Sequence, residues 1–524
     1  MLACIPNCEN APWLNCVSKI ILVCVLFPIA LSACTPSAES LTEDGIRKKI
    51  EEDRASIYQH GAAPGEKLTL EDVLARALKY NLDTRVAELD ALIAANDVSL
   101  ERLNTLPTIT ANKQRVTRNN RGGSSSLSLL TGQQSLQPSI STDQHRNLYQ
   151  ISAEFDVLEA GINIGRARSA SDRSRIAQER RRKVYHNVLQ DAYSAYWRVA
   201  VAQMALPVID TLMTETKEQR ARIDDQIKQG IVILGEAQGA KAELQNRRQQ
   251  LSGMRQSLLL AETELKTLID YPLDQPLVLD LGDHNWLRGG KLPTVKETLS
   301  TLEDTAFINR PEVREEILNK NISARDIKLT FAETLPGMSA LLTYNYDSNS
   351  FLADRHWLDS VFSVTQAINK VLTLPARFER AENVDKLADR RRQALAAAII
   401  TQVHVAKARF DFLSEAYQES DVTARNAADI LKRAKDFNNT GLMSGAELLN
   451  VRIDSGMSAI SRAFAYADAQ DAYGRFINTL GVDLWDAGDI GLSVPEFASQ
   501  IRKNLQDEDL FTMQKVSVVE EVKL

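Results

Sequence analysis

The sequence predicts a mostly helical protein with a small β part, built from two similar halves. Residues 166–206 and 376–440 contain neither glycine nor proline, so nothing in these segments breaks a helix. Segments of alternating apolar and polar residues, which are typical of strands, follow two Leu-Pro pairs that end at Pro107 and Pro336. The sequence around the first pair matches the sequence around the second, at an offset of 229 in the numbering. Each of the two halves is therefore expected to contain both helices and strands.

The composition is that of a folded protein. Of 524 residues, 44% are hydrophobic and 25% are charged, which disfavours intrinsic disorder. The chain has 62 Lys and Arg residues against 69 Asp and Glu residues, and its net charge is −7. No nucleic-acid partner is expected for such a balance.

All five cysteines lie near the N-terminus, at Cys4, Cys8, Cys16, Cys24 and Cys34. The rest of the chain therefore contains no disulfide framework, cysteine-ligated metal or thiol nucleophile. An oxidising compartment suits such a chain.

An apolar run at residues 20–31 has the length of a signal-peptide core and is too short to span a bilayer. It ends in Leu31-Ser32-Ala33-Cys34, which resembles the bacterial lipobox. We predict a lipoprotein signal peptide at residues 1–33, lipid attachment at Cys34, and an N-terminal tether at residues 34–66. The alternative is an ordinary signal peptide in which a cysteine follows the cleavage site by chance.

The long breaker-free segments carry the spacing of packed helices. In the second of them, apolar residues step by four and three in turn, at Ile399, Val403, Ala406, Phe410, Leu413 and Tyr417. This is the seam of a coiled coil. A helix of about 65 residues is about 100 Å long. We therefore expect long antiparallel helices in a coiled coil or a helical tube.

Two offsets define the halves. The offset of 229 matches Ala77 with Ala306, Arg85 with Arg314, Ile93 with Ile322 and Asp97 with Asp326. A second offset, 211, matches Gly230 with Gly441 and Glu236 with Glu447. The difference predicts an insertion in the first half, placed in the polar loop at residues 119–147. The predicted parts are a first repeat (67–271), a linker (272–297), a second repeat (298–484) and a C-terminal tail (485–524).

Four strands are expected in each chain. Alternation is clear at residues 149–157 and 338–346, and a further strand carries Leu358, Phe362, Val364 and Ile368 on one face. The first strand, residues 108–118, is weak because Lys113 and Arg115 share a face. The strand lengths suit a membrane, in which four strands cannot close a barrel but three copies could supply twelve. Half-buried strands of a soluble protein are the alternative.

Several short segments carry a further signal through their order and duplication, namely Leu68-Thr69-Leu70-Glu71-Asp72-Val73-Leu74, Asn309-Arg310-Pro311-Glu312-Val313-Arg314, Glu154-Phe155-Asp156-Val157, Gly165-Arg166-Ala167-Arg168, Gly230 and Gly441. With these residues the chain resembles the TolC/OprM family of outer-membrane efflux channels over residues 67–484. The resemblance implies a homotrimer in which long helices form an α-helical barrel in the periplasm. The four strands of each chain would contribute to a twelve-stranded transmembrane β-barrel in the outer membrane.

The same resemblance implies where the site lies. The turns at Gly230 and Gly441 would form the periplasmic tip, where the tube closes and an adaptor docks. Candidate gate or adaptor-contact residues are Glu236, Glu447, Asn450 and Asp454. The alternative is that these acids are solvated residues near helix N-termini, where the helix dipole favours them.

No enzyme is expected. The six histidines, His60, His145, His186, His284, His356 and His404, show no ligand spacing, and no nucleotide-binding or hydrolase motif occurs. We predict no catalytic residue, metal or cofactor. The basic runs at residues 180–183 and 390–392 are interpreted as solvated helix faces.

The predicted function is a passive exit duct of a tripartite efflux system, of the RND type that the resemblance implies. Its partners would be a periplasmic adaptor (membrane fusion protein), an inner-membrane pump and outer-membrane lipid. Two alternatives stay open. One is the outer-membrane component of type I protein or peptide secretion, and the other is a periplasmic coiled-coil lipoprotein scaffold without a pore.

Overall fold

A computed structural model describes residues 42–60, 66–135, 137–282, 290–486 and 488–506. The chain divides into two units, residues 1–59 and 60–524, which are described separately. In the first unit, helix α2 (Glu43–Ser56) begins at Thr42, whose side chain accepts a hydrogen bond from the Gly45 amide. The predicted signal peptide and the lipid site at Cys34 lie outside the described residues.

The second unit contains all the other elements. The first half consists of α3 (Leu70–Tyr80), α4 (Leu82–Leu103), β1 (Thr108–Thr117), the short strands β2 (Gly123–Ser124) and β3 (Ser139–Ile140), β4 (His145–Asp156), α5 (Val157–Lys228), α6 (Leu234–Leu259) and α7 (Ala261–Leu268). The second half consists of α8 (Leu299–Asn309), α9 (Pro311–Ala332), β5 (Gly337–Asp347), β6 (His356–Thr365), α10 (Ile368–Leu372), α11 (Leu374–Asn439) and α12 (Gly445–Leu480). A short 3₁₀ helix (Asp489–Gly491) and helix α13 (Val494–Leu505) follow.

The element boundaries confirm the duplication. The first residues of α3, α4 and β1 match the first residues of α8, α9 and β5 at the first offset, 229. The first residues of β4 and α6 match those of β6 and α12 at the second offset, 211. The offset changes between the two strands of each half, which places the extra residues of the first half between β1 and β4.

Local sequence explains why the short helices end and begin at neighbouring residues. Thr69 and Asp72 form a capping box at the start of α3, and Asn81 caps the start of α4. In the second half, Pro311 occupies the first turn of α9, where its missing amide proton is not needed. In each half, a pair of short helices with a defined break between them therefore leads into the first strand.

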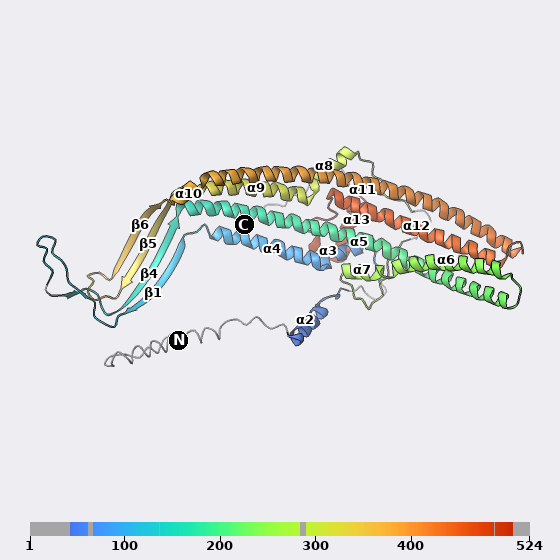
Figure 1. Ribbon diagram of the computed structural model, residues 1–524, viewed down its shortest axis with the longest axis horizontal. Coiled ribbons are helices and arrows are strands. Elements are labelled where there is room, and N and C mark those ends of the chain that lie inside the picture. The colour runs from blue at the N-terminus through green and yellow to red at the C-terminus, as the bar shows by residue number, and fades with distance from the viewer. Residues whose placement is uncertain (1–41, 61–65, 136, 283–289, 487, 507–524) are drawn as a thin grey trace. The chain divides into compact units, whose positions relative to one another are not determined.

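The four main strands form one antiparallel sheet in the order β1-β4-β5-β6. Figure 1 shows the sheet at one end of the long helices of this unit, with the turns between α5 and α6 and between α11 and α12 at the opposite end. Strand β1 pairs with β4 along its whole length, although its sequence pattern is weak.

Two details of the predicted strands are wrong. The polar loop predicted at residues 119–147 contains a small hairpin of β2 (Gly123–Ser124) and β3 (Ser139–Ile140), and its last residues belong to β4. The last predicted strand ends at Thr365, and Ile368 instead begins α10. The apolar spacing that predicted a strand therefore continued past the end of β6 into a helix.

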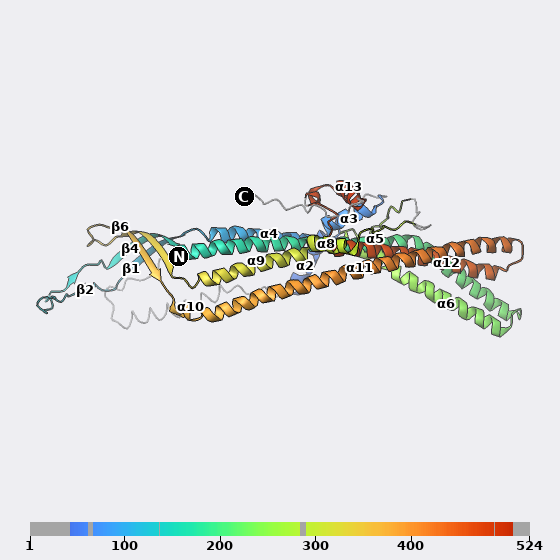
Figure 2. The same cartoon turned by 90° about the horizontal axis from the view of Figure 1, so that it is seen from above.

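The long helices pack along the predicted seam. Ile399, Val403, Phe410 and Tyr417 are buried, and the two seam residues between them pack against the same core. In Figure 2 the α5–α6 hairpin and the α11–α12 hairpin both extend past α3 and α13 to the end opposite the sheet. None of the described helices is both long and apolar enough to cross a membrane.

Part of the predicted C-terminal tail belongs to this core. Helix α13 packs on α3, and Phe497 and Ile501 on its inner face are fully buried. Arg502 of α13 also forms an ion pair with Glu71 of α3. The sequence pattern missed this helix because it is short and follows a segment without a clear period.

Candidate functional site

The sheet exposes its apolar face. The cross-strand register places Ile109, Ala111, Ile151, Ala153, Phe155, Met338, Ala340, Leu342, Tyr344, Leu358, Phe362 and Val364 on one face. Ile109 is 71% exposed and Phe362 is 83% exposed. Contiguous apolar surface of this kind is unusual in water and marks contact with lipid or with another protein.

The opposite face is polar and internally hydrogen-bonded. Gln150 donates to Asn345 at 2.9 Å, and Asn345 donates to Asp359 at 2.8 Å. Arg146 donates to the buried carboxylate of Asp347 at 2.7 Å. A sheet with its buried hydrogen bonds on the polar side and its apolar side exposed has the reverse arrangement of a soluble sheet.

Both edges of this sheet are open among the described residues. Strand β1 pairs only with β4, and β6 pairs only with β5. Ten residues at each edge therefore present backbone groups with no strand beside them. In lipid, unpaired backbone groups cost several kcal/mol each, about as much as burying a polar group. In a lipid environment, these edges would therefore need a further strand.

At the other end of the unit, the two helical hairpins turn at the predicted glycines. Gly230 has φ +70° and Gly441 has φ +79°, a conformation that favours glycine. In the first turn, the Ile231 amide donates to the Gln226 carbonyl at 2.9 Å, and the Gly230 amide donates to Ile227 at 3.1 Å. This pattern is a Schellman motif, and the Gly441 turn repeats it.

The four candidate residues near these turns have different surroundings. Glu447 completes a capping box with Ser444, whose backbone amide and hydroxyl donate to it at 2.9 and 2.8 Å. These hydrogen bonds hold the pKa of the Glu447 carboxyl below its usual range. Glu236 lies exposed in the first turn of α6, and Asn450 is half-buried on α12. Glu447 thus makes the contacts expected of the alternative, in which it is a solvated residue near a helix N-terminus and not part of a gate.

Asp454 lies one turn beyond Asn450 and forms an ion pair with Arg247 of α6. Arg247 also donates to Glu243 of its own helix at 2.8 Å. Two residues before Asp454, Arg452 pairs with Glu215 of α5. Charged pairs therefore tie α12 of the second half to both helices of the first hairpin near its turn. Sequence reasoning named Asp454 but neither of its basic neighbours.

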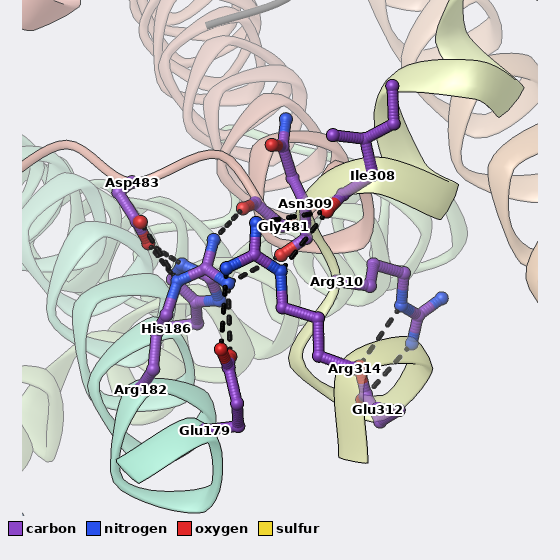
Figure 3. A network of polar contacts seen from close by, with 10 residues as sticks. All are labelled: Glu179, Arg182, His186, Ile308, Asn309, Arg310, Glu312, Arg314, Gly481 and Asp483. Carbon is purple, nitrogen blue, oxygen red and sulfur yellow. Dashed lines mark hydrogen bonds and ion pairs between the residues drawn. The ribbon is translucent and has the colours of Figure 1, made fainter. Parts of the chain in front are cut away.

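A second polar network lies at the junction of the two halves and was not foreseen (Figure 3). Arg182 of α5 donates from its Nε atom to both carboxylate oxygens of Asp483 at 2.8 Å. Its other nitrogens donate to the carbonyl oxygens of Asn309 at 2.6 Å and Gly481 at 2.8 Å. His186 approaches the same carboxylate at 2.7 Å. The network thus satisfies the C-terminal carbonyls of α8 and α12.

The predicted solvated face at residues 180–183 is therefore wrong for its central residue. The Arg182 side chain is only 16% exposed. Its neighbours Arg180 and Lys183 reach across to Glu315 and Glu312 of α9. The contacts of Arg182 join parts of the chain that are far apart in the sequence, so they hold the fold together.

The described residues contain no group of three or more His, Asp or Glu side chains placed to hold a metal ion. Hollows on the helix surfaces are open grooves, such as the one lined by Asp210, Arg248 and Arg255. The candidate site therefore consists of surfaces, namely the sheet faces, the sheet edges and the hairpin turns.

Comparison with solved structures gives a clear match. The chain superimposes on the CmeC outer membrane channel of Campylobacter jejuni with a TM-score of 0.59, 15% identity, and coverage of 82% of this chain and 89% of that one. The chain therefore has the fold of this outer-membrane channel. The open state of the MtrE outer membrane channel of Neisseria gonorrhoeae gives a TM-score of 0.60 at 18% identity, covering 79% and 88% of the two chains.

A third match is the outer membrane protein VceC of Vibrio cholerae, with a TM-score of 0.58, 11% identity, and coverage of 79% of this chain and 96% of that one. The sequence matches no protein-family model, and no curated protein matches it. The predicted fold, a mostly helical duplicated chain with a small sheet, is confirmed. The similarity lies in structure and extends over nearly the whole of each solved chain.

Proposed function

We propose that this chain is one subunit of a homotrimeric exit duct in the bacterial outer membrane. The observation that carries the proposal is the sheet, whose apolar face is exposed and whose two edges are open. Three such sheets would join edge to edge into a barrel of twelve strands. Lipid would cover the apolar faces, and the polar faces would line the lumen.

The helices of the trimer would form an α-helical tube that extends into the periplasm. The Gly230 and Gly441 turns lie at the end away from the sheet, where a periplasmic adaptor and an inner-membrane pump would engage them. Small molecules would pass through the tube without a chemical step, and the pump would supply the energy. The family resemblance favours an RND-type efflux system over type I secretion.

Near the turns, Glu236, Glu447, Asn450 and Asp454 would form the gate or the adaptor contact. Three copies of an acidic side chain around a threefold axis concentrate negative potential in a narrow pore. Asp454 adds a link between hairpins, because its partner Arg247 belongs to the other half. Breaking this link would free the second hairpin to move.

The N-terminus would anchor the subunit. Lipid attached at Cys34 would hold the tether, residues 34–66, at the membrane, and residues 1–33 would be removed. The repeats at residues 67–271 and 298–484, joined by residues 272–297, would form the tube and barrel. A Cys34→Ala protein should lose its lipid-modified mass, and retention of that mass would contradict the anchor.

Planar-bilayer recording of the purified full chain tests the duct. We expect trimers by native mass spectrometry and stepwise conductance on insertion. Correctly folded trimers without conductance would support the scaffold alternative and overturn the proposal. Copurification of an adaptor with an efflux pump, in place of a protein-secretion ATPase, would separate the two kinds of duct.

A further inference from the structure

One row of residues crosses the apolar face of the sheet from edge to edge. Lys113 of β1 is opposite Tyr149, Tyr149 is opposite Tyr346, and Tyr346 is opposite His356. The side chains touch in turn, with the Lys113 ammonium 5.3 Å from the centre of the Tyr149 ring and the two tyrosine rings 5.7 Å apart. Arg115 lies two residues further along β1 on the same face. We call Lys113 and Arg115 the basic pair.

The basic pair is separated from every acid of the sheet. The carboxylates in the four main strands are Glu154, Asp156, Asp347 and Asp359, and the register places all of them on the polar face. Arg146, also on the polar face, is neutralised by Asp347. Within the described part of the chain, neither member of the basic pair forms an ion pair, and both side chains are exposed. Positive charge on the apolar face is thus uncompensated.

The duplication shows that the fold does not require these charges. At the first offset, Lys113 corresponds to Leu342 and Arg115 to Tyr344 of β5. Strands β1 and β5 both begin directly after a Leu-Pro pair, so these positions correspond in the repeat, although the register sets Lys113 in the row of Tyr346, four residues beyond Leu342. The second half places apolar residues there, as lipid contact predicts. The first half places cations there instead.

The position of Lys113 and Arg115 along the strands indicates which part of a lipid they would contact. Apolar rows extend from Met338 to Tyr344, about 20 Å along the strand at 3.4 Å per residue. The row of Tyr149 and Tyr346 comes next, and tyrosines concentrate where the hydrocarbon ends and the headgroups begin. Lys113 and Arg115 lie at and beyond this row, towards the loops between the strands. If the sheet spans a membrane, their charges would therefore lie near headgroup level, beyond the apolar rows.

We propose that Lys113 and Arg115 bind the phosphate of an anionic lipid headgroup at the rim of the barrel farthest from the helices. Arginine can grip a phosphate through two parallel hydrogen bonds, and lysine adds a second positive charge beside it. The lipid tails then cover the apolar rows below. This site rests on the proposed function, because it requires the sheet to lie in a membrane.

Native mass spectrometry of the full-length trimer in detergent tests the site. Phosphatidylglycerol, phosphatidylcholine and inorganic phosphate are added separately to the wild type and to the double variant Lys113→Leu/Arg115→Tyr, which copies the sequence of β5. We expect the wild type to retain phosphatidylglycerol over phosphatidylcholine. In the double variant this preference should fall about 25-fold, because each basic residue near an anionic surface contributes a factor of about five.

Lys328→Leu is the matched control, because Lys328 is an exposed lysine of α9 outside the sheet. This variant should bind lipid as the wild type does. Equal lipid preference in wild type and double variant overturns the proposal, and so does displacement of the lipid by inorganic phosphate at equal concentration. Bilayer conductance of the same samples separates the two proposals. Normal conductance without lipid preference rejects this site alone, whereas folded trimers without conductance reject the duct.

Discussion

Asp454 of α12 forms an ion pair with Arg247 of α6, a residue 207 positions earlier in the chain. The pair joins the second helix of one hairpin to the second helix of the other. Its Asp454 side chain is 58% exposed, whereas that of Arg247 is 17% exposed. The arginine is therefore held in place by its surroundings, and the aspartate can be released from it with little disruption of the core.

Replacing Asp454 with asparagine should open the proposed duct while leaving the stability of the fold nearly unchanged. An exposed ion pair contributes about 0.2–1 kcal/mol to stability. If the pair holds the hairpin in its resting position, its loss shifts the population towards the open state. We expect a higher resting conductance in planar bilayers and nearly unchanged unfolding in urea.

Asp411→Asn is the control for this prediction. Asp411 is 57% exposed and pairs with Lys407 on its own helix, so its loss removes a similar ion pair without uncoupling the hairpins. Its resting conductance should equal that of the wild type. Equal conductance in the two variants would show that the Asp454 pair does not restrain the hairpin.

Alanine at either turn glycine should destabilise the fold. A Cβ atom at Gly230 or Gly441 would meet nothing within 4 Å, so the cost comes from the positive φ alone. That conformation costs an L-residue about 1–2 kcal/mol. Gly253 lies inside α6 and is equally open, so alanine there should instead stabilise by about 0.5–1 kcal/mol. Opposite signs in urea unfolding would confirm the expectation, and equal signs would contradict it.

Much of the fold could be predicted because its signals are local. The strand that begins after Pro336 and the seam from Ile399 to Tyr417 each follow from spacing within a short segment, and the turn at Gly230 follows from its match with Gly441. The duplication then supplied a second copy of each signal. The weak first strand was still placed correctly, because its partner segment in the second half carries the clear pattern.

The contacts between distant segments could not be predicted. Arg182 meets Asp483 across 301 positions, and no periodicity of either segment indicates that pairing. The same holds for Asp454 and Arg247. Sequence patterns also could not place Lys113 at the tyrosine row, because the register between β1 and β4 depends on the length of the intervening insertion.

Arginine on the two faces of β6 should have opposite consequences. Phe362 lies on the apolar face, and its neighbour Val361 on the polar face is 50% exposed. If the apolar face meets lipid, Phe362→Arg should cost about 2–4 kcal/mol near the membrane midplane. Val361→Arg should then be tolerated, because its side chain would meet water in the lumen of the proposed barrel. Trimer yield and thermal stability after reconstitution measure both, and equal tolerance would contradict lipid contact.

Glu312, in the first turn of α9, should make stability depend on pH. Burial raises the pKa of its carboxyl, but hydrogen bonds and the charge of Arg310 outweigh burial and lower the pKa to about 2. The Arg310 guanidinium approaches both of its oxygens, at 3.2 and 3.3 Å, and Lys183 lies 3.2 Å away. Because the pKa is lower in the folded state than the ordinary value of 4.5, the ionised group stabilises the fold at neutral pH.

That contribution should be complete above about pH 5 and should fall as the pH drops towards 2, since the carboxyl then takes up a proton in both states. Glu312→Gln should therefore lower the free energy of unfolding by roughly 1–2 kcal/mol at pH 7, after allowance for a partly exposed pair. The difference from wild type should shrink below pH 4.5. Glu316→Gln, whose parent residue forms no ion pair in the described part of the chain, is the control. Urea unfolding at several pH values measures both, and a Glu312→Gln deficit that stays constant down to pH 3 would refute the assignment.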